Sequence, residues 1–294
     1  MILLRYIGLC GALLQAAWSI SQPERSVHYN RLLHQASVLQ AKGETPAAFM
    51  AYDSAFANIP WGLWDISEAV ALALRSGDTA RAINHLELLY ARGGEPLITY
   101  SNDIIGLLAT GTHVAALGLA REATSHWIMQ ADSVWIKALM EMRELDQSDR
   151  SSDPIMLRND SINLHRLVTL TDERGYPTQT RTGACYGIVN LLFWHHRSEL
   201  ASSPAVQQFW AMTQAEIAAG EVPPDYLCAF LDFDDFHADR PMRYGTLLYY
   251  FHQKGDIKLI EREELNRNRA SVGLETIEDF ALVTDLDLDA LIAK

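Results

Sequence analysis

The sequence predicts a mainly α-helical protein, in which an α-solenoid of helical repeats is followed by a helical domain with one small β-hairpin. Three observations predict this fold class: a 34-residue repeat in the first half, apolar residues at helical spacing through most of the second half, and one β-rich stretch near residues 244–260. The chain has 294 residues, of which 49% are hydrophobic and 21% are charged. This composition is typical of globular proteins, and the length predicts about two domains.

Residues 1–21 predict a signal peptide. Arg5 supplies a positive charge, an apolar segment follows over residues 7–18, and Ser19 and Ser21 are small residues at the two positions that a signal peptidase reads. The apolar segment is shorter than the ~20 residues that span a bilayer. We therefore expect cleavage after Ser21 and export to the periplasm or the medium, with a membrane-anchored helix as the alternative. No later segment predicts a membrane span, so the mature chain should contain none.

Residues 22–125 predict pairs of helices. Two sets of residues recur at intervals of 34: Gly43, Gly77 and Gly111, and Ala48, Ala82 and Ala116. In each unit a helix would end at the glycine turn, and the small alanine of the next helix would allow close packing. Glu44 and Asp78 begin the second helices, where negative charge complements the helix dipole.

The period, the turn glycines and the small residues resemble the tetratricopeptide family over roughly residues 26–122. The aromatic and proline signatures of that family are only partly present, and the third unit is degenerate. The resemblance implies an α-solenoid that binds a protein or peptide in its concave groove. The alternative is that so few units serve only as a spacer or support for the next domain.

Residues 130–280 predict a helical domain. A long helix over residues 127–145 leads into it, and further helices are expected over about 160–175, 183–197, 204–219, 226–236 and 261–273. Two β-rich runs, 244–252 and 257–260, flank a Gly-containing turn and predict the hairpin. Residues 281–294 are expected to form a C-terminal tail with a short helix that the acidic residues near 285–289 cap.

A series of residues in this second half occurs in a recognisable order. The series is Arg143, Asp146–Gln147, Asn163, Arg166–Leu167, Gly175–Tyr176–Pro177, His196, Gly220–Glu221–Val222, Tyr244–Gly245–Thr246, Arg269 and Val272–Gly273–Leu274. It resembles an uncharacterised family of bacterial proteins, classed as a domain of unknown function, over about residues 135–280. The resemblance implies no known reaction. The family has glutamine, arginine and glutamine at the positions where this chain has His195, Phe233 and Leu247, respectively. The resemblance therefore implies that this chain has lost part of any polar site that its relatives share.

The retained polar residues are the candidates for a catalytic site. His196 can exchange protons near neutral pH, Asp232 can orient its imidazole, and Tyr244 can donate a hydrogen bond. In the alternative interpretation His196 only ends its helix, where its charge would complement the helix dipole.

Further candidates would bind a ligand. Arg269 could hold an anionic group, with Thr246 and His195 beside it. We expect no metal and no cofactor. Adjacent residues on a helix point ~100° apart, so His195 and His196 are poor ligands for one ion, and no zinc, phosphate-loop or dinucleotide motif occurs.

The net charge of -13 repels phosphate backbones and predicts that nucleic acid is not a partner. After cleavage of the leader, Cys185 and Cys228 could form one disulfide or remain buried as free thiols. The molecular activity stays unknown. The sequence favours an exported binding or scaffolding protein with a protein or peptide partner. The alternative is a small-ligand binder or enzyme that uses His196, Asp232, Tyr244 and Arg269.

Overall fold

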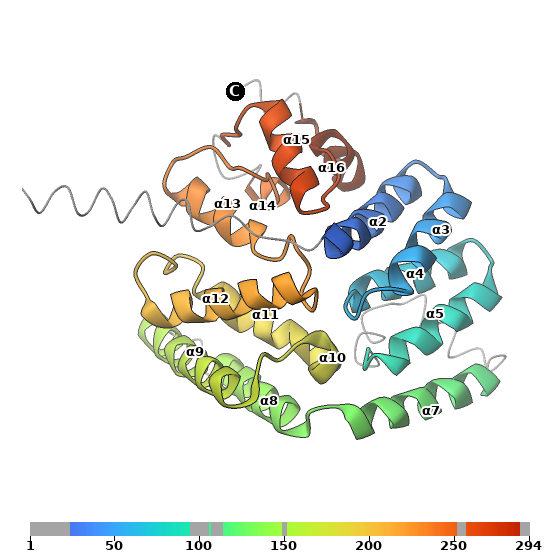
Figure 1. Ribbon diagram of the computed structural model, residues 1–294, viewed down its shortest axis with the longest axis horizontal. Coiled ribbons are helices and arrows are strands. Elements are labelled where there is room, and N and C mark those ends of the chain that lie inside the picture. The colour runs from blue at the N-terminus through green and yellow to red at the C-terminus, as the bar shows by residue number, and fades with distance from the viewer. Residues whose placement is uncertain (1–23, 95–105, 107–113, 149–151, 252–256, 289–294) are drawn as a thin grey trace, which may run out of the picture.

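The computed structural model describes residues 24–94, 106, 114–148, 152–251 and 257–288, and this part of the chain is mainly helical (Figure 1). The predicted signal peptide, the third repeat glycine Gly111 and the expected turn of the hairpin lie outside the described residues. Among the described helices, none combines the length and the apolar character that crossing a membrane requires.

The first four described helices form two helix–turn–helix pairs, as the repeat predicts. They are α2 (Glu24–Ala41), α3 (Thr45–Phe56), α4 (Leu63–Arg75) and α5 (Thr79–Ala91), with α2 packed on α3 and α4 packed on α5. Gly43 and Gly77 adopt φ angles of 78° and 77° in otherwise open space, so the left-handed backbone of each turn is what favours glycine. The repeat alanines Ala48 and Ala82 are fully buried.

The long helix predicted over residues 127–145 is in fact two helices, α7 (Val114–Gln130) and α8 (Ser133–Ser148). Asp132 breaks the run, because its carboxylate accepts the backbone N–H of Trp135 at 3.1 Å and so caps the start of α8. Arg181 fixes this carboxylate from a distant part of the chain, with Nη2 at 2.6 Å from Oδ2. The spacing of apolar residues around Asp132 does not predict that Arg181 pairs with it.

The second half continues with further helices, most of them near their predicted positions. They are α9 (Asp153–Arg174), α10 (Gln179–Thr182), a 3₁₀ turn (Gly183–Cys185), α11 (Tyr186–His195), α12 (Pro204–Ala219), α13 (Cys228–His237), α14 (Leu248–Phe251), α15 (Arg262–Ser271) and α16 (Ile277–Thr284). Helix α9 begins earlier than expected, with a proline in its first turn. Asp160, at the expected start of this helix, therefore lies inside α9.

The prediction of a β-hairpin near residues 244–260 is wrong for the described residues. Leu248–Phe251 forms the short helix α14, and no described residue of the run 244–252 pairs with the run 257–260. An isolated parallel bridge joins Met242, just before the first run, to Leu259. The backbone N–H groups of Tyr244 and Thr246 donate to the carboxylate of Asp232, so they do not serve a strand partner. Strand propensity depends on such pairing, and here a buried side chain competes for it.

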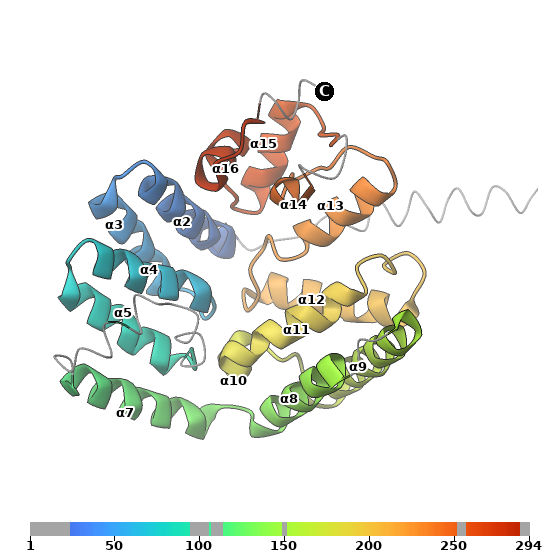
Figure 2. The same cartoon turned by 180° about the vertical axis from the view of Figure 1, so that it is seen from behind.

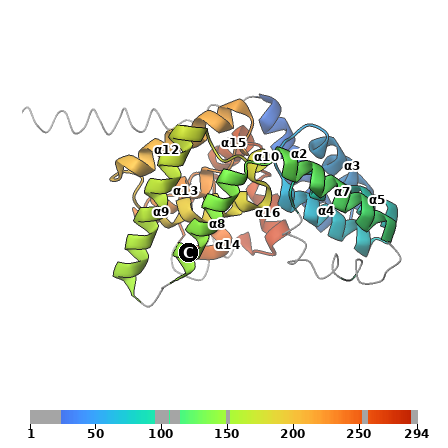
Figure 3. The ribbon, with the colours of Figure 1, turned by 90° about the horizontal axis from the view of Figure 1, so that it is seen from below.

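The chain curves so that its last helices return to its first (Figures 1 and 2). Helix α16 packs against α2, and Asn30 Nδ2 donates to the carbonyl of Val272 at 2.8 Å. Separate hydrophobic cores lie within α2–α5, within α8–α13 and within α13–α16. Seen from below, α2–α5 and α7 lie to one side of the molecule and α8–α14 to the other (Figure 3). The fold thus brings two distant parts of the sequence face to face.

Candidate functional sites

Asp232 and Thr246, two of the predicted site residues, meet in a buried contact that fixes the 244–246 loop. Asp232 lies on α13 and is 0% exposed. Its Oδ1 accepts the N–H of Tyr244 at 2.9 Å, and its Oδ2 accepts the N–H and the hydroxyl of Thr246, each at 2.7 Å. Burial raises the pKa of Asp232 to about 6, although these three hydrogen bonds lower it. The carboxylate therefore serves the loop itself.

Arg269 holds the same loop from α15. Its Nη1 donates to the carbonyl of Tyr244 at 2.6 Å, its Nε donates to the carbonyl of Glu275 at 2.6 Å, and its guanidinium lies over the ring of Phe280. Burial lowers the pKa of Arg269, and only 1% of the residue is exposed. Arg269 thus binds groups of its own chain and does not face an external anion.

His196 lies apart from this loop, at the end of α11. Its Nδ1 is 3.0 Å from Glu199 Oε1, and its Nε2 is 3.1 Å from the carbonyl oxygen of Asp160. Neither contact involves Asp232, so the predicted catalytic pair of His196 and Asp232 does not form in the described structure. The position of His196 agrees with the alternative, in which it ends its helix.

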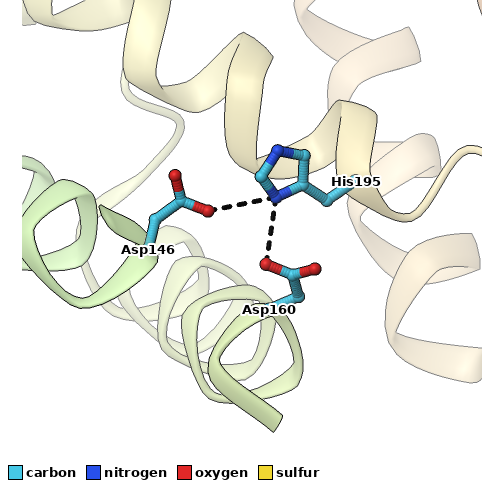
Figure 4. A group of neighbouring side chains, drawn as sticks. All are labelled: Asp146, Asp160 and His195. Carbon is cyan, nitrogen blue, oxygen red and sulfur yellow. Dashed lines mark hydrogen bonds and ion pairs between the residues drawn. The ribbon is translucent and has the colours of Figure 1, made fainter. Parts of the chain in front are cut away.

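His195 points into a cluster of carboxylates that the sequence analysis missed (Figure 4). Its Nδ1 lies 3.0 Å from Asp160 Oδ1 on α9 and 3.1 Å from Asp146 Oδ1 on α8. The side chain of Asp146 is 0% exposed, and those of Asp160 and His195 are each 14% exposed. Asp146 belongs to the series that resembles the bacterial family, but Asp160 was expected only as the start of a helix. The three residues stand on different helices, so no spacing along the chain links them.

A pocket of about 240 Å³ lies where the first helix pairs face the second half of the chain. Its walls come from α2, the start of α4, α10, α11 and the segment 223–226, and its polar lining residues include Asn30, His34, Asp65, Gln179, Asn190, Asp225 and Tyr226. The two halves touch beside it, because Trp61 Nε1 donates to the carbonyl of Gly220 at 3.1 Å and Leu63 N–H donates to Gln179 Oε1 at 3.3 Å. We call this space the junction pocket.

Charged groups gather at one wall of the junction pocket. His34 Nδ1 is 2.8 Å from Glu275 Oε2, and its Nε2 is 3.6 Å from Asp225 Oδ2. Burial alone lowers the pKa of His34, but these two carboxylates raise it to about 10. Burial raises the pKa of Asp65 to about 6, with His34 acting against that rise. Arg269 Nη2 lies 3.4 Å from Glu275 Oε1 and offsets the charge of that carboxylate. At neutral pH the two remaining carboxylates, Asp65 and Asp225, outnumber the imidazolium of His34, which leaves the wall negative.

Asn190 Oδ1 and the Tyr226 hydroxyl oxygen are among the buried polar atoms beside the junction pocket that have no hydrogen-bond partner in the described part of the chain. Leaving a buried polar group unpaired costs about 1–3 kcal/mol. A water molecule or a ligand in the pocket would remove that cost. None of the predicted site residues lines the pocket, because its walls combine segments that only the closed fold brings together.

The two cysteines of the described chain, Cys185 and Cys228, are both free thiols, so they do not form the disulfide that the sequence left open. Burial raises the pKa of both thiols, which keeps them protonated near neutral pH.

Comparisons of the chain with protein-family models, with curated proteins and with solved structures find no match. Both resemblances described above stay predictions. Function must accordingly be argued from the chemistry of the sites.

Proposed function

We propose that this protein binds a small organic cation in the junction pocket. The observation that carries the proposal is the convergence of charged and unpaired polar groups on one enclosed space. A concave site with a few convergent polar groups is the usual form of a small-molecule site. The loop around Asp232, by contrast, is filled by groups of the chain itself.

The charge of the pocket favours a cationic ligand. The carboxylates of Asp65 and Asp225, which line the pocket, outnumber the imidazolium of His34, while Glu275 behind His34 is paired with Arg269. Asn190 adds a buried acceptor that an ammonium or guanidinium N–H could satisfy. Trp61 and Trp64 also line the pocket, and indole faces attract organic cations. The net charge of -13 would further steer cations toward the molecule.

The size of the pocket favours a small molecule over a peptide. We propose that α2–α5 are the start of a short tetratricopeptide-like solenoid, as the 34-residue repeat predicts. Along the junction, Asn30 and Trp61 of these helices bind backbone carbonyls of the second half. The remaining space of about 240 Å³ is near the lower end of ligand pockets, which are typically ~300–1,000 Å³. The groove expected for a protein or peptide partner is thus partly occupied by the chain itself.

The predicted leader would place this binding activity outside the cytoplasm. The pKa of Asp65, about 6, would then make the affinity for a cation depend on pH. Above pH 6 the carboxylate is charged and attracts the ligand. Below pH 6 it becomes neutral, so we expect the affinity to fall as the pH falls.

The test is calorimetric titration of the full chain with choline, agmatine and putrescine, each at pH 7.5 and pH 5. We expect at least one of these cations to bind, and 3,3-dimethylbutan-1-ol, the neutral isostere of choline, to bind more weakly. Replacing Asp65→Asn should weaken binding about 10-fold or more, since a hydrogen bond to a charged group contributes about 1.5–3 kcal/mol.

The control is Asp172→Asn, which removes one negative charge from an exposed position on α9 and should leave the affinity unchanged. Two results would overturn the proposal. One is that none of the three cations binds with a Kd below about 1 mM, equivalent to -4.1 kcal/mol. The other is that Asp65→Asn and Asp172→Asn bind equally well.

A further inference from the structure

We propose that Asp146, Asp160 and His195 bind one divalent transition-metal ion. This site is separate from the junction pocket and does not depend on the function proposed for it. The three side chains come from α8, α9 and α11 and converge on one point (Figure 4). Each offers one ligand atom, and these atoms all lie within 4.8 Å of one another.

The distances suit shared coordination. An ion with bonds of ~2.1 Å holds neighbouring ligands ~3.0 Å apart in an octahedron and ~3.4 Å apart in a tetrahedron. The imidazole Nδ1 of His195 is 3.0 Å from one carboxylate oxygen and 3.1 Å from the other. These separations match two neighbouring edges of an octahedron. An ion could therefore be held with little movement of the side chains.

A metal ion can also bind all three side chains at once, which the single proton on His195 Nδ1 cannot do. Nδ1 can carry one hydrogen, which can point along only one of its two short contacts. The contact of His195 Nδ1 with Asp160 has the geometry of a hydrogen bond. The contact of Nδ1 with Asp146 is an ion pair that lacks this geometry. A divalent ion would replace the single proton and bind both carboxylates at once. It would also offset the repulsion between two negative groups beside one imidazole.

Neighbouring residues already orient the proposed ligands. Gln147 Nε2 donates to Asp146 Oδ2, and His196 Nε2 contacts the backbone carbonyl of Asp160. Asn163 Nδ2 donates to the carbonyl of Met142 at 3.0 Å and so ties α9 to α8. Outer contacts of this kind are what hold ligating side chains in place in metal sites. The adjacent histidines thus have different roles: His195 binds the ion and His196 positions Asp160.

The ligand set indicates the kind of ion. One imidazole nitrogen with two carboxylate oxygens suits Zn²⁺ or Mn²⁺, whereas Mg²⁺ and Ca²⁺ prefer oxygen alone. Three protein ligands leave further positions for water, and the partial exposure of Asp160 and His195 gives solvent access to them.

The test begins with the full chain, freed of metal by a chelator and titrated with ZnCl₂ and MnCl₂ by calorimetry. We expect one strong site per chain for at least one of the two ions, and weak binding of MgCl₂. Asp160→Asn and His195→Gln should each weaken binding more than 10-fold, because even changes to outer contacts cost 10–100-fold in metal affinity. His165→Gln, an exposed histidine on α9, is the matched control and should bind like the original protein.

A second measurement requires no variant. Electron spin-echo spectroscopy of the Mn²⁺-loaded protein should show coupling to one directly bound imidazole nitrogen. Absence of stoichiometric binding with both Zn²⁺ and Mn²⁺ would overturn the proposal. So would binding of equal strength in Asp160→Asn, His195→Gln and His165→Gln, or a bound Mn²⁺ with no imidazole coupling.

Discussion

Asp232 illustrates how a single buried carboxylate can decide the conformation of a segment. The run from Tyr244 has the composition of a strand, yet its N–H groups point to Asp232 and not to a neighbouring chain segment. Gly245 between them has a φ of 65°, which a strand does not use. One side chain on α13 therefore overrides the local preference of several residues.

We predict that Asp232→Asn lowers the free energy of unfolding by about 2–3 kcal/mol. The amide has one acceptor oxygen in place of two, and its NH₂ group would face an N–H donor of the loop, which leaves buried donors unpaired. Urea denaturation at pH 7 measures the loss. Asp234→Asn on the same helix is the control, since Asp234 is 32% exposed and pairs with Arg240 at the surface, and it should change stability by less than about 0.5 kcal/mol. Equal losses in the two variants would contradict the role assigned to Asp232.

The sequence identified some of the correct residue types but not their partners. His195 and His196 were expected to point in different directions because adjacent helical residues diverge. Both contact Asp160, His195 through its carboxylate and His196 through its backbone carbonyl. The contacts with Asp146 and Asp160 depend on how α8, α9 and α11 pack, which no spacing in one segment encodes. Only the contact of His196 with Glu199, three residues further on, is local. For the same reason the junction pocket could not be predicted.

At the scale of helices, the sequence was more informative. The turn glycines of the first two repeats, the proline and glycine at the ends of α12, and the apolar spacing all mark features that the structure confirms. Such signals are local, so a short window contains them. The break at Asp132 was missed because apolar spacing does not show that its carboxylate caps the N–H of Trp135. The short helix α14 was missed because Asp232, on another helix, holds the loop that precedes it.

Helix α2 is fixed to the C-terminal segment by an ion pair that should depend on pH. The pKa of His34 is raised to about 10, above its ordinary value of 6.5, by Asp225 and Glu275. The stabilisation is therefore complete below pH 6.5 and is lost as the pH rises through 10. We predict that the free energy of unfolding falls by at least about 1 kcal/mol between pH 6.5 and pH 10, and that His34→Gln reduces this fall.

Chemical denaturation at both pH values measures the effect of His34. The matched control is His28→Gln, an exposed histidine on the same helix, which should show the same pH dependence as the original protein. If His34→Gln also retained that full dependence, another group would have to be responsible.

At the scale of the whole molecule, the closing contact between α2 and the end of α15 is very tight. A Cβ atom on Gly273 would lie 2.5 Å from the carbonyl oxygen of Val27 and 2.9 Å from the backbone nitrogen of Arg31. Both are backbone atoms of α2, so they cannot move aside as a flexible side chain could. Gly273 thus allows the last helices to approach the first.

We predict that Gly273→Ala is more destabilising than Gly43→Ala. Both glycines have positive φ angles, 81° and 78°, so both variants carry the ~1–2 kcal/mol cost of a left-handed alanine. Gly43 has nothing within 4 Å of its Cβ position, so only Gly273→Ala adds a steric clash. Thermal unfolding should show a loss at least about 1 kcal/mol greater for Gly273→Ala. Equal losses would mean that the closing contact is looser than the structure shows.

The same contact constrains when the protein can fold. Asn30 and Val272, which hydrogen-bond across the closure, are 242 residues apart, so the first helix leaves the ribosome long before its partner has been made. Contacts of such long range form slowly, because a long loop must close first. The contact between α2 and the end of α15 can therefore form only after residue 272 has been made. For a chain with the predicted export leader, this late closure would help keep it unfolded until it has crossed the membrane.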